Sequence, residues 1–226
     1  MTLGNRILRR TRKVPEEICT AFRALPVANV GDSMQRMFAA GPQLRPVHTT
    51  VVNIAGPALT VRVRPGDNLM LHYALDIAEK GDVMVVDAGG DLTTAIMGEI
   101  MVAMAIRKGV QAIVINGAIR DRDEIRAMGL PVWAAGVTHR GPYKTGPGEV
   151  NTAISLGGMV IAPGDLVIGD GDGVLAVPFD ETAALLDAGR AKHAAEQVEL
   201  AAIAEGRNDR GWVLAALKAS GCSFEE

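Results

Sequence analysis

The chain has 226 residues, of which 48% are hydrophobic and 22% charged, and its formal net charge is -3. That balance favours one soluble globular domain with a substantial core over two small domains. Lysine and arginine are scattered through the chain, and only 4% of the residues are aromatic. The composition therefore argues against a nucleic-acid-binding protein, which needs a clustered basic surface.

The chain also lacks the patterns of a secreted or membrane-spanning protein. Its arginine-rich start is not followed by the run of about 7 to 15 apolar residues that a signal peptide contains. The longest apolar run, residues 100–106, is far shorter than the ~20 residues that cross a bilayer. Cys19 and Cys222 match no metal-ligand spacing and no redox motif, which is typical of a reducing compartment. We therefore expect a cytoplasmic protein.

The first third of the chain predicts two helices followed by strands. A proline in the first turn and apolar side chains on one face favour a helix at residues 15–25. Asp32 is the expected N-cap of a short helix that ends near Ala39, before a Gly-Pro pair. Residues 51–54 and 58–63 favour strands, the second with alternating apolar side chains.

The middle of the chain predicts a βαβ unit. A helix at 68–79 precedes the strand VMVVDA at 83–88, which is apolar enough to be buried on both faces. A glycine-rich loop then leads into a helix at about 95–108, which Gly109 ends. The strand AIVIN at 112–116 completes the unit. Because a helix joins the two strands, they should lie parallel in one sheet.

A second βαβ unit follows, and a long helix comes near the end of the chain. Residues 123–128 favour a helix and residues 132–135 a strand, after which a loop rich in glycine and proline extends to Gly148. A helix is expected at 180–206. Three further strands are predicted before it, at residues 159–161, 165–168 and 173–177. This order of elements predicts the α/β fold class.

Two charged residues follow a buried strand directly, in the segment INGAIRDRDE. Arg120 and Asp121 stand where the strand of the first βαβ unit leaves its sheet, and the loop 88–94 follows the neighbouring strand. Ligands in open α/β sheets bind outside the carboxyl ends of parallel strands, because the loops diverge there. The two segments should therefore face one cavity.

Both charged residues also have ordinary structural explanations. Asp121 stands three residues ahead of Glu124, which is the spacing of a capping box for the following helix. Arg120 has the alternative of an exposed charge paired with a neighbouring carboxylate, which contributes well under ~1 kcal/mol. The sequence leaves both alternatives open.

The helix that begins near Gly98 forms the other wall of this cavity. Its free backbone N–H groups and partial positive charge suit a substrate carboxylate. Glu99 stands at the same place and would repel an anion unless a cation lay between them. Glu99 and Asp121 together suggest a divalent metal ion with oxygen ligands, of which Mg²⁺ is the expected one. The alternative is that Glu99 simply pairs with the helix dipole.

Several other polar groups are expected to have no catalytic role. Asp170 and Asp172 lie in a Gly-Asp-Gly-Asp-Gly segment, which favours a hairpin turn over a metal site. Lys80 and Lys108 lie beside a turn and at a helix end, where a solvated amine is unsuited to Schiff-base chemistry. The loop around Lys144 fits a solvated surface loop better than a substrate lid. No role is assigned to the isolated histidines, His48, His72 and His193.

The spacing of the site residues resembles that of a known family. Glu99, twenty intervening residues and then Arg120-Asp121 match the acidic-x20-Arg-Asp signature of the class II 4-hydroxy-4-methyl-2-oxoglutarate and 4-carboxy-4-hydroxy-2-oxoadipate aldolases. Those enzymes share their fold with the RraA-type regulators of ribonuclease E activity. The likeness extends through most of the chain, in the segments VGDSM, GGDLTTAIMGEI, VINGAIRD and APGDLVIGDGDGVLAVP.

The resemblance implies one RraA-like aldolase domain over residues 1–226. The expected fold is the family's swivelling β/β/α sandwich, with a C-terminal helix at about 180–206 that packs on a neighbouring subunit. The expected activity is that of a lyase, which cleaves a tertiary 2-oxo-4-hydroxy acid and releases pyruvate, with oxaloacetate decarboxylation as a side activity. The implied cofactor is Mg²⁺ or Mn²⁺. The implied partners are a small 2-oxo acid and further copies of the chain, in a homotrimer or a dimer of trimers, with no nucleic acid and no membrane.

The resemblance also implies roles for particular residues. Asp121 binds the metal directly, and Glu99, where the family often has aspartate, holds it through water. Arg120 meets the pyruvate carboxylate and the developing enolate oxygen. The carboxylate is held by the start of the helix, at Gly98, Ile100 and Met101.

A further glutamate comes in this family from the C-terminal helix of a neighbouring subunit. Glu196 is the best match and Glu199 the competitor. Without the resemblance, Glu196 is an ordinary solvated helix residue near Lys192. The expected base for the C4 hydroxyl proton is a metal-associated water, polarised by Glu99, Asp121 and this glutamate.

Three alternatives to this aldolase are weighed. A non-enzymatic regulator of ribonuclease E would share the fold, but it has no need of a metal-binding carboxylate beside Arg120, so Asp121 favours the enzyme. A related lyase on another 2-oxo acid would share the site, because fold and enolate chemistry do not determine the leaving half. A menaquinone methyltransferase is disfavoured, because GGDLTTAIMG lacks the G-x-G-x-x-G spacing of a nucleotide-cofactor site.

Overall fold

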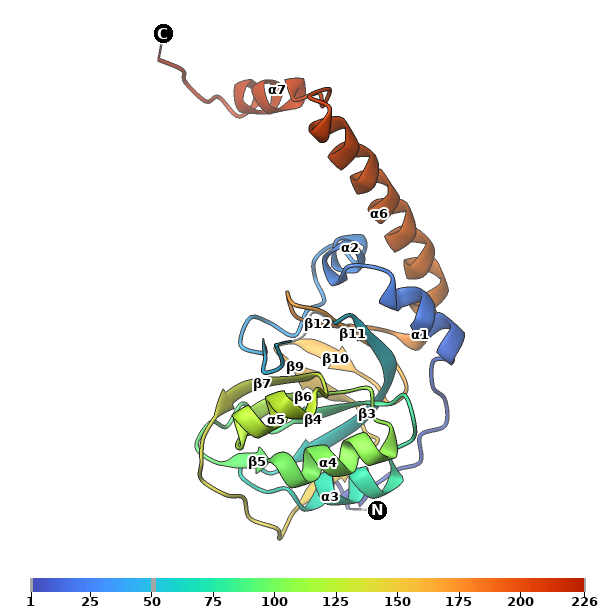
Figure 1. Cartoon of the computed structure of the whole chain (residues 1–226), viewed down its shortest axis with the longest axis vertical. Coiled ribbons are helices and arrows are strands. Elements are labelled where there is room, and N and C mark those ends of the chain that lie inside the picture. Colours follow the sequence, from blue (N-terminus) through green and yellow to red (C-terminus); the bar gives the residue numbers. More distant parts are fainter. Residues whose placement is uncertain (1, 50–51, 226) are drawn as a thin grey trace.

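The computed structural model describes residues 2–49 and 52–225. Figure 1 shows a body of stacked layers, from which one long helix projects. The main sheet has the strand order β1 (Arg6–Ile7), β8 (Gly148–Val150), β3 (Ile54–Val63), β4 (Val83–Asp87), β6 (Ala112–Ile119), β7 (Val132–Val137) and β2 (Arg45–Pro46). Three more strands join its members, namely β5 (Ala95–Met97), β11 (Leu166–Gly169) and β12 (Val174–Val177). A separate two-stranded sheet consists of β9 (Ile154–Leu156) and β10 (Met159–Ile161).

Helices cover both sides of this β structure. One side carries α3 (Leu69–Ile77), α4 (Glu99–Lys108) and α5 (Arg122–Met128). The other side carries α1 (Glu16–Arg23), α2 (Val27–Ser33) and the beginning of α6 (Thr182–Ala204), which follows a 3₁₀ turn, η1 (Phe179–Glu181). The last element is α7 (Gly211–Ala219). The α/β class expected from the sequence is confirmed, and α1 and α2 form a helical layer on the side opposite α3, α4 and α5.

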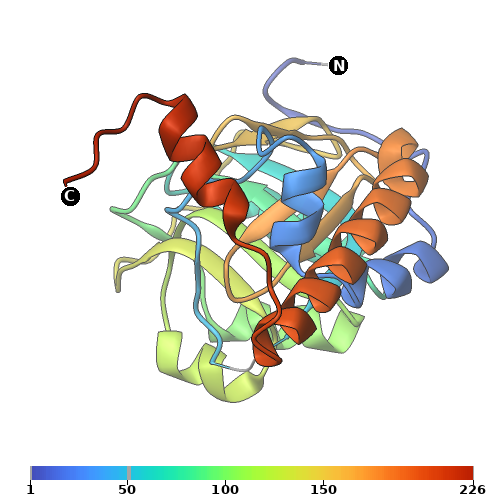
Figure 2. The same cartoon turned by 90° about the horizontal axis from the view of Figure 1, so that it is seen from above.

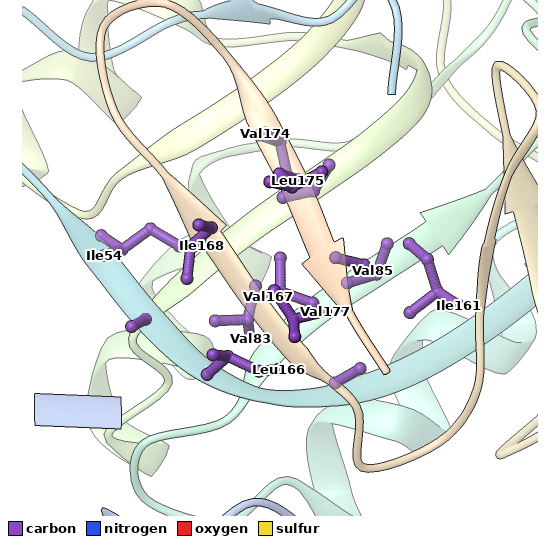
Figure 3. Close-up of a cluster of buried hydrophobic side chains, with 14 of the residues drawn as sticks. Ile54, Val83, Val85, Ile161, Leu166, Val167, Ile168, Val174, Leu175 and Val177 are labelled. Carbon is purple, nitrogen blue, oxygen red and sulfur yellow. The ribbon is translucent and has the colours of Figure 1, made fainter. Parts of the chain in front are cut away.

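The central strand β4 supplies side chains to two separate cores. Val83 and Val85 pack with β11, β12 and the α1–α2 side, whereas Met84 and Val86 pack with α3 and α4 on the opposite face. Figure 3 shows the first of these cores, in which Val83 and Val85 face the side chains of the β11–β12 hairpin. Successive side chains of a strand point to opposite faces of its sheet. The four apolar residues of this strand are therefore buried on both faces of the sheet, as predicted for VMVVDA.

Both predicted βαβ units are present. Strands β4 and β6 pair in parallel, and so do β6 and β7. The predicted start of the helix at about residue 95 is wrong, because residues 95–97 form β5, which pairs in parallel with the end of β6. A run of three apolar residues does not distinguish a strand from the first turn of a helix, and pairing with β6 decides it here.

Two predictions for the first third of the chain need correction. The helix expected after Asp32 ends near it instead: α2 spans Val27–Ser33, and the side chain of Asp170 accepts a hydrogen bond from Val27 N at 2.9 Å. The two strands expected at 51–54 and 58–63 are one strand, β3, with residue 51 outside the described residues. Strand β3 pairs with β11 up to Pro57 and with β4 from Ala58 onward, so its partner changes between these two residues.

The long helix α6 leaves the body soon after it begins. Its buried residues are Leu186 and Gly189, and α7 has no buried residue. Figure 1 shows the rest of α6 extending away from the layers, with α7 at its far end, and Figure 2 shows both helices from above. We call residues 190–219 the arm. Among the described residues, no helix is long and apolar enough to cross a membrane.

Candidate functional site

The pairing of β5 with β6 brings the predicted site residues together. Met97 is paired with Ile119, and Arg120 N donates a hydrogen bond to Met97 O at 2.9 Å. The next residues of both segments are therefore neighbours. Asp121 Oδ2 accepts a hydrogen bond from Glu99 N at 3.1 Å, and it lies 3.5 Å from Arg120 Nε. The start of α4 is therefore in direct contact with Arg120 and Asp121, as expected. The loop 88–94, which was also expected to face the cavity beside them, does not line it.

Asp121 does not cap the helix that follows it. Its backbone is left-handed, with φ +56°, and its side chain makes no capping hydrogen bond to α5. Aspartate tolerates this conformation better than most residues. The left-handed turn directs the carboxylate toward the start of α4, and the capping box with Glu124 is therefore wrong.

Two glycines allow the arginine and aspartate to approach the backbone. A Cβ atom on Gly98 would lie 2.3 Å from Asp121 Oδ2 and 3.0 Å from Arg120 Nε. A Cβ atom on Gly141 would lie 3.2 Å from Arg120 Nη1. The guanidinium group therefore lies between two segments of bare backbone, and larger residues would displace it.

A cavity of about 260 Å³ opens beside these groups. Arg120 lines it, together with three residues that the sequence assigned to substrate binding, Gly98, Ile100 and Met101. In the first turn of α4, Glu99 N–H donates to Asp121 and Met101 N–H donates to Gly98 O at 3.1 Å. Among the described residues, the Ile100 N–H has no acceptor. It is thus the amide most available to an anion in this cavity.

Three polar residues of the cavity were not assigned to the site from the sequence. Asn68, His72 and Lys144 all line it. Asn68 and His72 are four residues apart on or beside α3, so they share one face of that helix. Burial, and then the nearby charge of Lys144, lowers the pKa of His72 below its ordinary value. The helical spacing of Asn68 and His72 is the only sequence signal that could have linked these two residues. No local signal indicated that α3 borders the site.

The loop that carries Lys144 is attached firmly to the start of α3. The buried carboxylate of Asp67 accepts hydrogen bonds from the backbone N–H groups of Leu69, Thr145 and Gly146, at 2.9, 2.7 and 2.9 Å. Burial alone would raise the pKa of Asp67, but these N–H groups hold it below the ordinary value. The loop therefore borders the cavity, and it is also a surface loop, as the sequence favoured, because Tyr143, Lys144 and Thr145 are exposed.

The carboxylates at this site fit a partly hydrated divalent cation. Asp121 Oδ1 accepts no hydrogen bond from the described residues, and the side chain is about one-third exposed. Oxygen ligands and retained waters are what Mg²⁺ prefers. Within residues 2–49 and 52–225, no group of three or more acidic, histidine or cysteine side chains could hold a metal ion. Among the described residues, no third acidic side chain therefore joins Asp121 and Glu99 in such a group.

Glu196 and Glu199 lie on α6, and neither lines the cavity of the same chain. Glu196 accepts a hydrogen bond from Asn29 and lies 3.6 Å from Lys192 Nζ. Glu199 is exposed and makes no side-chain hydrogen bond or ion pair with the described residues. The single chain therefore does not join either glutamate to Arg120.

The remaining polar groups have structural roles or lie in solvent. Asp170 Oδ1 accepts a hydrogen bond from Asp172 N at 2.9 Å in the β11–β12 turn, as the hairpin interpretation predicted. Lys80 and Lys108 are exposed. His48 is buried edge-on against Trp133, with ring centroids 4.5 Å apart.

These features define an α/β protein with a polar site at the carboxyl ends of parallel strands. The chain belongs to the RraA-like family. The sequence model of that family, described as Aldolase/RraA, matches residues 27–176, which include the whole strand-end site. The resemblance seen in the sequence is thereby confirmed.

Three relatives illustrate the family. A protein of Halalkalibacterium halodurans, provisionally named a 4-hydroxy-4-methyl-2-oxoglutarate aldolase, is 36% identical over 189 residues, which cover 84% of this chain and 90% of the relative. RraAS2 of Streptomyces coelicolor, described as an unusual member of the RNase ES inhibitor RraA protein family, is 25% identical with a TM-score of 0.76, covering 83% of this chain and 97% of that one. An uncharacterised protein of Pseudomonas syringae shares the fold, with a TM-score of 0.77 and 24% identity over 86% of this chain and 95% of that one.

Proposed function

We propose that the protein is a divalent-metal-dependent aldolase. Its substrates are 2-oxo-4-hydroxy acids of the 4-hydroxy-4-methyl-2-oxoglutarate or 4-carboxy-4-hydroxy-2-oxoadipate type, and its product is pyruvate. The observation that carries this proposal is the contact of Asp121 with Arg120 and with the first amide of α4, at the edge of a cavity. The aldolase name of the relative that is 36% identical supports the same conclusion.

The residues of the cavity match the charge that such a reaction develops. Retro-aldol cleavage moves electrons onto the C2 oxygen of the pyruvate half, so donors aimed at that oxygen accelerate the reaction. Arg120 is the donor proposed for it, because its guanidinium borders the cavity. The Ile100 N–H and the N-terminus of α4 hold the substrate carboxylate. Arginine cannot lose its proton at neutral pH, so it stabilises charge and does not act as the base.

Asp121 is the residue proposed to hold the cation directly, with Glu99 acting through water. Mg²⁺ or Mn²⁺, when bound, supplies several kcal/mol of stabilisation to negative charge on the oxo acid. The hydrogen bond from Glu99 N orients Asp121 Oδ2 and leaves Oδ1 for the ion. Glu99 is the first residue of α4, and its backbone contact with Asp121 supports this role.

A second copy of the chain is proposed to complete the site. The arm exposes large apolar side chains to solvent, among them Val198, Leu200 and Trp212, which are 72%, 56% and 68% exposed. Such a surface is typical of a protein interface. Assembly as a homotrimer or a dimer of trimers would cover the arm and bring Glu196 of one subunit to the Arg120 cavity of the next. In this assembly, residues 180–206 pack on a neighbouring subunit, which is the role that the family resemblance implied for them.

The proposed activity is tested by assaying pyruvate release from a panel of 2-oxo-4-hydroxy acids and from oxaloacetate. Each assay is run after EDTA treatment and again after Mg²⁺ or Mn²⁺ is restored. We expect release that EDTA abolishes and either ion restores, fastest with substrates that carry a carboxylate on C4. Activity that survives EDTA would contradict the metal requirement. Activity confined to another 2-oxo acid would identify a related lyase instead.

A second candidate function is a non-enzymatic regulator of a ribonuclease, which the description of the Streptomyces coelicolor relative favours. RNA cleavage by a ribonuclease E is measured with and without the protein, and with its Asp121→Asn variant. Inhibition by both forms, without pyruvate release from the panel, would favour the regulator over the aldolase.

A further inference from the structure

Glu196 does not extend freely into solvent from α6. Its Oε2 accepts a hydrogen bond at 2.5 Å from the side-chain amide of Asn29, which belongs to α2. Asn29 is only 2% exposed. A buried side chain from a different helix therefore holds this carboxylate, 167 residues away in the sequence.

A chain of alternating charges surrounds the same carboxylate. Lys192 Nζ lies 3.6 Å from Glu196 Oε1 and 3.0 Å from Asp32 Oδ2. Asp32 Oδ1 in turn lies 2.7 Å from Arg36 Nε. Both oxygens of Glu196 therefore have a partner within the chain, while the side chain remains 47% exposed.

The choice of asparagine at position 29 is not explained by stability. Its amide nitrogen must face Glu196, because an ionised carboxylate only accepts hydrogen bonds. The other half of the amide, Oδ1, is then buried without a partner among the described residues. A buried carbonyl without a hydrogen bond has a free-energy cost. An apolar residue beside Val30 would avoid that cost, so the amide is best explained by what it does to Glu196.

Glu199 provides the contrast on the same helix. It lies three residues farther along α6, is exposed, and has no side-chain partner in the described part of the chain. A free glutamate must lose the freedom of three side-chain torsions when it joins a site, whereas a held glutamate has already lost it. Of the two glutamates, only Glu196 is prepared in this way.

We propose that Asn29 and Lys192 are positioning residues, which aim the carboxylate of Glu196 at the Arg120 cavity of a neighbouring subunit. The inference rests on the proposed aldolase function and on the shared site. It selects Glu196 over Glu199, and it makes α2 part of the catalytic apparatus although α2 touches no substrate. The two residues act through Glu196, so their effects disappear when that carboxylate is absent.

The test is a double-mutant cycle on the full-length, metal-loaded protein. kcat and KM for pyruvate release are measured for Asn29→Ala, Glu196→Gln and the double variant, with Glu199→Gln as the matched control. We expect Asn29→Ala to lower kcat about tenfold with little change in KM, and to change it less than about twofold in the Glu196→Gln background, because residues that act as a unit are not additive. Glu199→Gln should stay within about twofold of the wild type.

Two further variants separate positioning from folding. Asn29→Asp keeps the size of the side chain but removes the donor, so it should lower kcat even if Asn29→Ala lowers the melting temperature. Lys192→Met should lower kcat, and Lys192→Arg should restore most of it, because only the arginine retains the charge between Asp32 and Glu196. A general structural defect would not produce this rescue.

The outcomes distinguish the inference from the proposed function. Equal losses from Asn29→Ala in both Glu196 backgrounds, or no loss of kcat in Asn29→Asp, would overturn the positioning role while the aldolase stands. Full activity in Glu196→Gln would remove this glutamate from the site, and the inference with it. A wild type that releases no pyruvate from any substrate of the panel would overturn the aldolase itself.

Discussion

The body and the arm of this molecule use apolar residues in opposite ways. In the body, every residue of β4 from Val83 to Val86 is buried between two cores. In the arm, Val198, Leu200 and Ile203 stand at least half exposed. Removing apolar surface from water is the main favourable term in folding. The body therefore buries the apolar residues of its central strand within one chain, whereas the arm leaves apolar surface that another molecule could cover.

The same contrast divides the candidate site. Arg120, Asp121 and the start of α4 are assembled within one chain by the pairing of β5 with β6. Glu196 is ordered by α2 at the base of the arm, away from that cavity. One half of the site is thus complete in the single chain, and the proposed other half depends on assembly. Substitutions in either half of the site, or in the arm, test this division.

The largest effect is expected from Asp121→Asn, within the half of the site that one chain completes. The asparagine oxygen can still accept the Glu99 N–H, so the melting temperature should stay nearly unchanged. Metal-dependent pyruvate release should be lost, because a neutral amide is a poor ligand for Mg²⁺, which supplies several kcal/mol of stabilisation. Steady-state assays with and without added Mg²⁺ measure this. Wild-type activity in the variant would refute the metal-ligand role.

Arg120→Ala should remove about 2 to 4 kcal/mol of transition-state stabilisation, by analogy with the loss of one oxyanion donor. The matched control is Arg122→Ala, because Arg122 is exposed and pairs only with Asp123 among the described residues. kcat/KM is compared for the two variants. If Arg120→Ala changes kcat/KM by less than about threefold, the guanidinium has no part in stabilising the enolate.

A smaller effect is expected on stability from Asp67→Asn, which weakens the attachment of the cavity wall to α3. The loss at pH 7 should be about 2 kcal/mol, because charge-assisted hydrogen bonds to three backbone N–H groups are replaced by weaker ones. The folded-state pKa of Asp67 is lowered. Its stabilisation is therefore complete above its unfolded pKa of about 3.9 and is lost as the pH falls through the folded value.

Thermal unfolding from pH 7 to pH 3 measures this pH dependence. The difference between the wild type and Asp67→Asn should shrink as the pH falls below about 4. Asp76→Asn is the matched control, because Asp76 is exposed and its side chain makes no hydrogen bond with the described residues. A difference that stays constant down to pH 3 would mean that the carboxylate charge has no part in holding the loop.

The last prediction concerns the double substitution Leu200→Glu and Ile203→Glu in the arm. It should disturb assembly and leave the fold of the single chain unchanged. Far-UV circular dichroism should be unchanged, since neither side chain is buried in the chain. The molar mass by light scattering should fall toward the 23.7 kDa of one chain. Val160→Glu is the control, because Val160 is 65% exposed on the body. An unchanged oligomer in the arm variant would show that the arm does not mediate assembly.

The sequence indicated the order of the elements well wherever a signal was local. The apolar strand 83–86, the end of α4 at Gly109 and the long helix from Thr182 all lie where predicted. Errors occurred where a distant partner decides the structure. Strand β5 depends on its pairing with β6, and the start of α2 is held by Asp170, 143 residues farther along the chain. Short strands such as β8 and β9 were missed, because three residues show no period.

The sequence by itself determined that Arg120 and Asp121 leave a buried strand together, because strand periodicity and the glycine-rich loop before α4 place them at a sheet edge. Only the tertiary structure decided where Asp121 points, since its left-handed backbone turns the carboxylate from α5 to α4. It alone also placed Lys144 in the cavity wall and Asn29 against Glu196. Periodicity reports which face a residue occupies, whereas contacts between distant segments arise from packing the layers together.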